Sequence, residues 1–181
     1  MSTDTRMSSG QPGGPDGRPP EARRPEARRP DIHNPVHFLA FGFGSGLAPK
    51  APGTFGTLAA IPLWYLLAQL PLWGYLLGTL TVIAVGPWLC GRTSRDMGVH
   101  DHGGIVWDEF AGFLITMIAV PVSWLGLVLG FVLFRFFDVL KPWPIGWLDR
   151  RVHGGTGIML DDLVAGVYAA LVLQAALAWL G

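Results

Sequence analysis

The sequence predicts an all-α fold: a multi-pass membrane helical bundle of about four to five helices, with its polar loops on the cytoplasmic face. Composition gives the first reason, because half of the 181 residues are hydrophobic and only 14% are charged, whereas soluble proteins carry about 25% charged residues. The second reason is that the charges are confined to blocks, separated by uncharged runs at 51–91 and 110–134. A soluble, very apolar bundle with a tryptophan-rich core is the alternative.

The first uncharged run predicts two helices. One helix crosses the hydrocarbon core of a membrane with about 20 residues, and residues 51–91 are sufficient for two crossings. Pro71 and Gly74 indicate a turn inside this run. We therefore predict helices at 55–70 and 72–90.

The second uncharged run predicts a further helical hairpin. The segment PVSWLG at 121–126 interrupts the run, so we expect helices at 109–120 and 124–140. The first of them is short for a full crossing, and a single span through 110–134 would reduce the count to four helices. A last apolar run predicts a helix at 163–180.

The basic residues indicate the orientation of the bundle. All Lys and Arg lie in the segment up to Lys50, at 92–95 or at 135–151, and neither predicted hairpin turn carries one. Because cytoplasmic segments hold the excess of Lys and Arg, we expect these regions on the cytoplasmic face and the C-terminus outside. Every acidic residue and every histidine then falls on the cytoplasmic face.

The first 32 residues differ in composition from the rest of the chain. They are rich in Pro, Gly and Arg, contain the repeat EARRP-EARRP and lack the apolar stretch of a signal peptide. Such a segment buries too little surface to fold, so we predict a disordered tail at 1–32 and a membrane domain at 33–181. The formal net charge is zero, which gives no indication of a nucleic-acid partner, and the oligomeric state stays open.

Two pairs of adjacent carboxylates stand at predicted helix starts. The helix dipole favours an acid there by about 0.3–1 kcal/mol, so capping explains one acid better than two that repel each other. Mg²⁺ takes oxygen ligands, often one or two protein carboxylates completed by water and phosphate. The predicted metal ligands are Asp108, Glu109, Asp161 and Asp162, and the predicted catalytic carboxylates are Asp108, Glu109 and Asp138.

Basic and glycine-rich segments predict a phosphate site on the same face. Arg135 and Asp138 are three residues apart, so one helix face carries both, and Lys141 follows them. An ion pair would account for the first two, but a guanidinium inside an apolar helix also suits a phosphate. The segment FGFGSGL, with Gly44 and Ser45, is able to present backbone N–H groups to an anion, although its small residues also serve close helix packing.

Histidines are the expected proton donors. His100, Asp101 and His102 lie in a glycine-flanked loop, and His153 stands in the last polar segment. Imidazole titrates near neutrality and suits protonation of a leaving group, so His100 and His153 are both candidates. A zinc site of the His-x-His type is the alternative, but it lacks a clear third and fourth ligand.

Four long segments between His33 and the C-terminus are distinctive: HNPVHFLAFGFGSGLAPKAPGTFGTLAAIP, GVHDHGGIVWDEFAGF, FRFFDVLKPWPI and LDRRVHGGTGIMLDDLVAG. In this order they resemble the phosphatidylglycerophosphatase A family. The resemblance implies a Mg²⁺-dependent phosphatase of the bacterial inner membrane, which converts phosphatidylglycerol phosphate to phosphatidylglycerol on the route to cardiolipin. A phospholipid is then both the substrate and the expected binding partner.

The expected mechanism is attack of a metal-activated water on the phosphate, while Arg135 and Lys141 neutralise charge on its oxygens. An aspartyl-phosphate intermediate is the competing route. Two further classes are kept as alternatives. A membrane transporter would be expected to carry ionisable groups near the midplane as well, and a non-catalytic lipid-binding membrane protein would release no phosphate.

Overall fold

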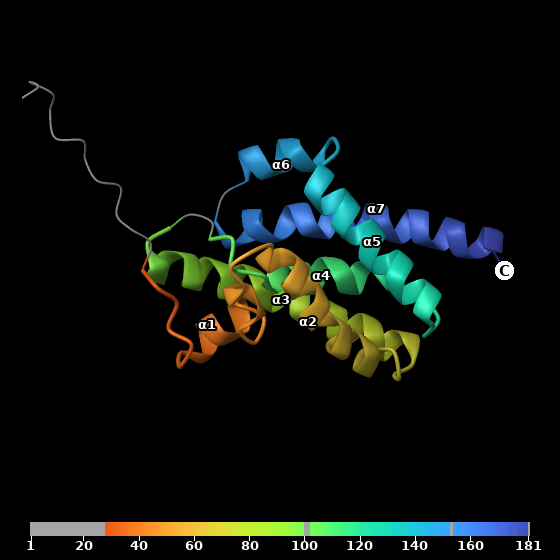
Figure 1. Ribbon diagram of the computed structural model, residues 1–181, viewed down its shortest axis with the longest axis horizontal. Coiled ribbons are helices and arrows are strands. Elements are labelled where there is room, and N and C mark those ends of the chain that lie inside the picture. The colour runs from red at the N-terminus through yellow and green to blue at the C-terminus, as the bar shows by residue number, and fades with distance from the viewer. Residues whose placement is uncertain (1–27, 100–101, 153, 181) are drawn as a thin grey trace, which may run out of the picture.

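The computed structural model describes residues 28–99, 102–152 and 154–180, and within these ranges every regular element is a helix. The predicted all-α class is confirmed. The elements in chain order are α1 Pro35–Ala40, the 3-10 turn η1 Ser45–Leu47, α2 Pro52–Leu67, α3 Leu72–Met97, α4 Trp107–Thr116, α5 Trp124–Leu140, α6 Ile145–Arg151 and α7 Gly155–Leu180 (Figure 1).

Two of these helices, α3 and α7, are long and apolar enough to cross a membrane. Each holds 26 residues and is about 39 Å long, which exceeds the hydrocarbon core of about 30 Å. Helices α2 and α5 hold 16 and 17 residues, or about 25 Å each. Helix α7 follows the long axis of the molecule, and α5 crosses it obliquely (Figure 1).

Local signals explain where several helices begin and end. The Asn34 side chain accepts a hydrogen bond from the Val36 N–H at 2.9 Å, with Pro35 at the first position of α1, a favourable combination at a helix start. Ser123 caps α5 in the same way through the Gly126 N–H at 3.1 Å. Gly98 ends α3 in the left-handed conformation, which glycine adopts without a Cβ clash.

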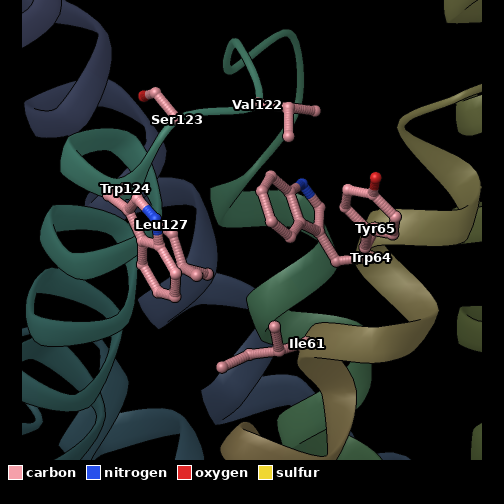
Figure 2. Close-up of a pocket in the computed structure, with 7 residues that line it drawn as sticks. All are labelled: Ile61, Trp64, Tyr65, Val122, Ser123, Trp124 and Leu127. Carbon is pink, nitrogen blue, oxygen red and sulfur yellow. The ribbon is translucent and has the colours of Figure 1, made fainter.

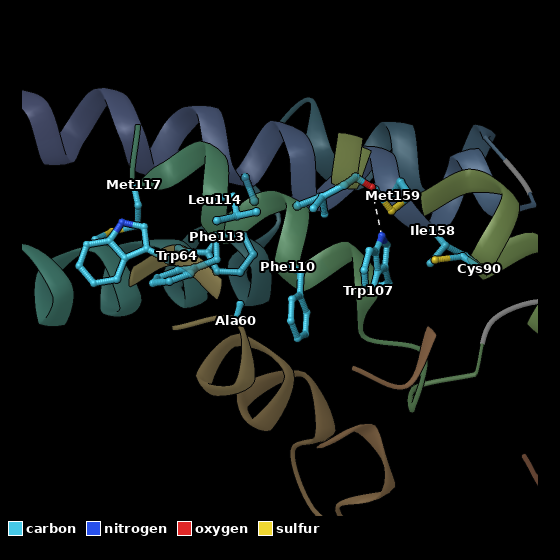
Figure 3. Packing of buried hydrophobic residues seen from close by; sticks show 14 of the residues in the cluster. Ala60, Trp64, Cys90, Trp107, Phe110, Phe113, Leu114, Met117, Ile158 and Met159 are labelled. Carbon is cyan, nitrogen blue, oxygen red and sulfur yellow. Dashed lines mark hydrogen bonds between the residues drawn. The ribbon is translucent and has the colours of Figure 1, made fainter. Parts of the chain in front are cut away.

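Helix α4 is the central helix of the bundle. Eight of its ten residues are buried, and it packs against α7, α2, α3 and α5. Phe110, Phe113 and Leu114 are fully buried, and Figure 3 shows them between the surrounding helices. The Trp107 indole N–H donates to the Val82 carbonyl at 3.1 Å. At about 15 Å, α4 is too short for a full crossing, as its sequence predicted.

Side chains from α3 and α7 satisfy the C-terminal end of α4. In an apolar medium each unpaired backbone carbonyl costs several kcal/mol, so a helix that stops inside a bundle needs partners. The Tyr75 hydroxyl donates to the Leu114 carbonyl at 2.6 Å, and the Gln174 amide donates to the Ile118 carbonyl at 2.8 Å. These two side chains allow α4 to end within the protein.

Glycines permit the close crossing of α4 and α7. A Cβ atom at Gly166 would lie 2.4 Å from the carbonyl oxygen of Gly112, so neither helix can carry a larger residue there without moving. The Thr116 hydroxyl lies 3.0 Å from the Gly112 carbonyl and 3.4 Å from the Gly166 carbonyl. Between helices in a membrane, close packing and hydrogen bonds of this kind drive association, and the crossing fixes α4 relative to α7.

Two predicted helix boundaries differ from the structure by more than the others. The last helix begins at Gly155 rather than 163, and the second continues past 90 to Met97. A Cβ atom at Gly155 would lie 1.9 Å from the Pro87 carbonyl oxygen, so the extra turns of α7 pack directly on α3. Tertiary contact therefore overrides the weak helix propensity of the glycines in 154–157.

Exposed tryptophans mark two levels of the bundle. At one end they lie at the start of α3, at the start of α5 and at the end of α7, as Trp73, Trp124 and Trp179. Towards the other end they are Trp88, Trp143 and Trp147. Amphipathic indole rings settle at membrane–water interfaces, so the two levels are consistent with the two boundaries of a membrane.

Candidate active site

Three helices bring charged side chains together at one end of the bundle, opposite the level of Trp73, Trp124 and Trp179, and a fourth helix packs against them. Helix α4 contributes its first turn, α5 its last turns and the residue that follows it, and α7 its second turn; α2 places its own first turn against them. We call this group the acidic cluster: Asp108, Glu109, Arg135, Asp138, Lys141, Asp161 and Asp162.

Glu109 and Arg135 form the central ion pair of the cluster. Arg135 Nη1 donates to both carboxylate oxygens of Glu109, which is only 7% exposed. The Thr57 hydroxyl lies 2.8 Å from Glu109 Oε2. A Cβ atom at Gly53 would lie 2.1 Å from Glu109 Oε1 and 3.1 Å from Arg135 Nη1. The first turns of α2 therefore pack directly against this ion pair. The close approach is possible because residue 53 has no side chain.

Three aspartates from α5 and α7 form a candidate cation site. Carboxylate oxygens of Asp138, Asp161 and Asp162 all lie within 4.8 Å of one another, and the two α7 residues are buried. Asp138 Oδ2 forms an ion pair with Arg135 Nη1 at 3.0 Å, and Asp161 Oδ2 accepts a hydrogen bond from Lys141 Nζ at 2.6 Å. Asp162 Oδ2 is buried and has no hydrogen-bond partner among the described residues.

Among the residues that the structure describes, the charges of the cluster do not balance. Five carboxylates face the two cations Arg135 and Lys141, and the other four carboxylates all lie close enough to Asp162 to act on its charge. Burial strengthens this repulsion because the local dielectric constant is low. At the same time, the Arg135 Nε is buried without a hydrogen-bond partner among the described residues. The cluster therefore contains a carboxylate oxygen that suits a bound cation, beside a guanidinium N–H that suits a bound anion.

The structure brings most of the predicted site residues together. The predicted proximity of Arg135 and Asp138 is confirmed by their ion pair. Asp108 is half-buried in the first turn of α4, where its Oδ1 accepts from the Glu109 N–H at 3.0 Å. The prediction that Asp161 and Asp162 open the last helix was wrong, because α7 begins at Gly155, and capping therefore does not explain this pair. His100 and His153 lie outside the described residues.

The turn with Gly44 and Ser45 uses its donors internally. The Gly44 N–H donates to the Phe41 carbonyl at 3.0 Å, and the Ser45 N–H and hydroxyl donate to the Gly42 carbonyl at 3.2 and 2.8 Å. A Cβ atom at Gly42 would lie 2.8 Å from both Val106 and Phe110, so the turn packs on the segment that leads into α4. A phosphate-binding role for Gly44 and Ser45 stays a prediction.

Gly53 and Thr57 were not among the predicted site residues. Both stand in the segment PGTFGT, whose uncharged composition gives no sign of a polar site. The available signal was their spacing: residues four apart share a helix face, so a glycine and a hydroxyl at 53 and 57 leave a small polar stripe on α2. That stripe is where Glu109 and Arg135 pack.

Fold and site together define a class: a helical membrane protein with a carboxylate-rich candidate active site at one end of its bundle. The family model described as phosphatidylglycerophosphatase A matches residues 38–177. The chain belongs to the phosphatidylglycerophosphatase A family, as its four distinctive segments predicted, and it is an enzyme of the phosphatase class.

Two curated relatives carry the same name. The chain is 57% identical over 143 residues to phosphatidylglycerophosphatase A of Escherichia coli (strain K12). The aligned region covers 78% of this chain and 83% of the relative. It is 49% identical over 149 residues to phosphatidylglycerophosphatase A of Haemophilus influenzae (strain ATCC 51907 / DSM 11121 / KW20 / Rd), with 81% of this chain and 91% of the relative covered. No solved protein structure matches the chain.

Proposed function

We propose that this protein hydrolyses the terminal phosphomonoester of phosphatidylglycerol phosphate, releasing phosphatidylglycerol and phosphate, with Mg²⁺ held in the acidic cluster. The observation that carries the proposal is the pair of unsatisfied groups in that cluster. Asp162 Oδ2 lacks a donor and Arg135 Nε lacks an acceptor among the described residues. Buried polar groups are normally hydrogen-bonded. A divalent cation on the carboxylates and a phosphate oxygen on the guanidinium would satisfy both.

The residues of the cluster fit Mg²⁺. This ion takes oxygen ligands and is often held by few carboxylates, with water and substrate phosphate as its other ligands. Asp138, Asp161 and Asp162 offer three oxygens within 4.8 Å of one another, and Asp108 lies close enough to act on Asp162. When bound, Mg²⁺ polarises phosphoryl oxygens and lowers the pKa of a bound water. Glu109 is less suited to the metal because Arg135 and Thr57 already occupy it.

The other polar residues orient the phosphate. The planar guanidinium of Arg135 can donate two parallel hydrogen bonds to a phosphate. The carboxylate of Glu109 fixes the orientation of this guanidinium by accepting from Nη1. Thr57 and Gly53 hold Glu109 against α2. Lys141, 2.6 Å from Asp161 Oδ2, adds a second positive charge at the edge of the cluster. The departing glycerol oxygen requires a proton, for which His100 and His153 remain the predicted donors.

Phosphate release by the purified protein in detergent micelles tests the proposal. We expect release from phosphatidylglycerol phosphate and none from phosphatidylglycerol, whose phosphodiester lacks a terminal phosphate. The matched pair of lipids controls for any general effect of the protein on phospholipids. Absence of release from the monoester, or equal release from both lipids, would contradict the proposed function.

The acidic cluster is proposed to face the cytoplasm of the bacterial inner membrane, since the basic residues in the described part of the chain lie at its end of the bundle. Gly103 is exposed, and a side chain there would meet nothing within 4 Å. In a Cys90→Ser background, which removes the only cysteine, Gly103→Cys should react with a membrane-impermeant maleimide only in inside-out vesicles. Gln69→Cys, in the exposed turn at the other end, should react only from the outer side. The reverse pattern would overturn the orientation.

A Gly53→Ala substitution should lower kcat/KM about a hundredfold, because misplacement of a catalytic group by about 1 Å can cost that much. The new Cβ would lie 2.1 Å from Glu109 Oε1, so the Glu109–Arg135 pair must move. Alanine is a better helix former than glycine by about 0.5–1 kcal/mol, so a weaker α2 would not explain the loss. Gly103→Ala, which adds a Cβ in open space, is the matched control and should retain turnover. Equal activity of both variants would contradict the role given to Gly53.

A further inference from the structure

A cavity of about 370 Å³ lies between α2 and α5, away from the acidic cluster. Ile61, Trp64 and Tyr65 of α2 line one side, and Trp124 and Leu127 of α5 line the other, with the 122–123 segment at its end (Figure 2). Ser123 also lines it, but its hydroxyl caps α5. The lining is otherwise almost entirely apolar or aromatic. It holds no group suited to chemistry and matches a hydrocarbon ligand.

The same two helices frame the cavity and the active site. At the charged end, Gly53 and Thr57 of α2 meet Arg135 of α5. Tyr65 lies eight residues after Thr57 on α2, and Leu127 lies eight residues before Arg135 on α5. Each of these separations corresponds to about 12 Å along the helix, in the direction of the cavity. Helices α2 and α5 both pack on α4, which lies behind the cavity in Figure 2. The cavity and the guanidinium of Arg135 therefore lie along the same pair of helices, with α4 packed against both.

The cavity is accessible from the side of the bundle. Tyr65, Val122 and Trp124 are exposed to 51%, 51% and 83%, on a surface that would face lipid. A hydrocarbon chain can therefore enter from the bilayer without passing through water. Its direction also fits, because acyl chains extend from the headgroup level into the membrane, as α2 and α5 extend from the acidic cluster to the cavity.

We propose that this cavity binds one acyl chain of the phospholipid substrate while the substrate's phosphate occupies the acidic cluster. This inference rests on the proposed function and specifies how that site recognises a lipid. The stretch of about 12 Å along the helices leaves room for the glycerol and phosphodiester groups between phosphate and chain. Binding energy from a remote chain can be used to orient the reacting phosphate. The site would thereby favour a lipid-borne phosphomonoester over a water-soluble one.

A tryptophan that fills the cavity tests this proposal. Dipalmitoyl and dihexanoyl forms of phosphatidylglycerol phosphate would be compared in the same micelles. In Leu127→Trp, the ratio of kcat/KM for the long-chain over the short-chain substrate should fall about tenfold, equivalent to ~1.4 kcal/mol. Val128→Trp is the matched control, since Val128 is the next residue on α5, is 53% exposed and does not line the cavity; its ratio should match that of the wild type.

An unchanged ratio in Leu127→Trp would overturn the acyl-chain site while leaving the phosphatase activity established. Wild-type protein that releases phosphate from neither substrate would instead overturn the proposed function. The two failures are therefore distinguishable in one assay.

A binding measurement gives a second test that does not depend on turnover and decides the case if Leu127→Trp fails to fold. Ile61→Cys, in the Cys90→Ser background, places a thiol in the cavity wall. Dipalmitoyl phosphatidylglycerol, the product, should slow its reaction with N-ethylmaleimide several-fold, and dihexanoyl phosphatidylglycerol should not. Equal labelling rates with the two lipids would overturn the proposal.

Discussion

An Asp162→Asn variant is expected to lose phosphate release by about a thousandfold or more while it remains folded and inserted. The substitution keeps the shape of the side chain but removes a buried anionic oxygen that has no hydrogen-bond partner among the described residues. A metal ion stabilises a phosphoryl transition state by several kcal/mol, and each 1.36 kcal/mol corresponds to a factor of about ten in rate. Loss of a central ligand should therefore be visible in kcat at saturating Mg²⁺.

The same substitution is expected to leave the stability of the fold unchanged or to raise it, although it abolishes activity. Asp162 lies among four other carboxylates, so removal of its charge relieves repulsion, and the thermal unfolding temperature should stay level or rise. Asp96→Asn is the matched control: Asp96 lies at the same end of the bundle but pairs with Arg92 at 3.0 Å and His37 at 3.4 Å, outside the acidic cluster. It should retain turnover. Near-normal kcat in Asp162→Asn would remove this residue from the site.

Removal of divalent metal should abolish phosphate release to a similar extent. After dialysis against EDTA, activity is expected to fall about a thousandfold, for the same several kcal/mol of electrostatic stabilisation. Addition of Mg²⁺ should restore it, and Ca²⁺ should restore less, because Ca²⁺ prefers longer bonds and more ligands than a compact three-aspartate site provides.

A change of fold must be separated from a loss of metal in that experiment. The helix content, followed by circular dichroism, should not change on chelation, because the packing around Phe110, Phe113 and Gly112 is made by apolar side chains and backbone atoms. Full activity in the absence of divalent ions would contradict the assignment of Asp138, Asp161 and Asp162 as metal ligands.

Helices whose ends are set by local chemistry could be predicted from the sequence. Helix α5 was predicted at 124–140 and is found there, because Ser123 provides a strong cap directly after a proline-containing turn. The start of α7 was missed because the glycines of 154–157 resemble a loop. Gly155 lets α7 approach Pro87 of α3, and only the tertiary structure reveals that contact.

The candidate site was predictable in its residue types and in the local pair of Arg135 and Asp138, but not in its long-range pairings. Doubled carboxylates beside apolar segments are unusual enough to identify Glu109 and Asp162 directly from the sequence. That Arg135 would bind Glu109, 26 residues away, and that Asp138 would join the α7 aspartates depends on how α4, α5 and α7 cross. Gly53 was missed for a related reason, since its contribution is the space that it leaves open.

The exposed indoles of Trp73, Trp124 and Trp179 also relate the enzyme to the thickness of its membrane. From Asp162 to Trp179 is 17 residues along α7, or about 25 Å, somewhat less than a hydrocarbon core of about 30 Å. If the indoles stay at the far boundary, the carboxylates lie level with the lipid phosphates in a thinner bilayer. In a thicker bilayer they lie below the phosphates, inside the hydrocarbon core. Tilting or local thinning relieves such hydrophobic mismatch at a fraction of a kcal/mol per ångström. We therefore expect bilayer thickness to regulate how readily a lipid phosphate reaches the acidic cluster.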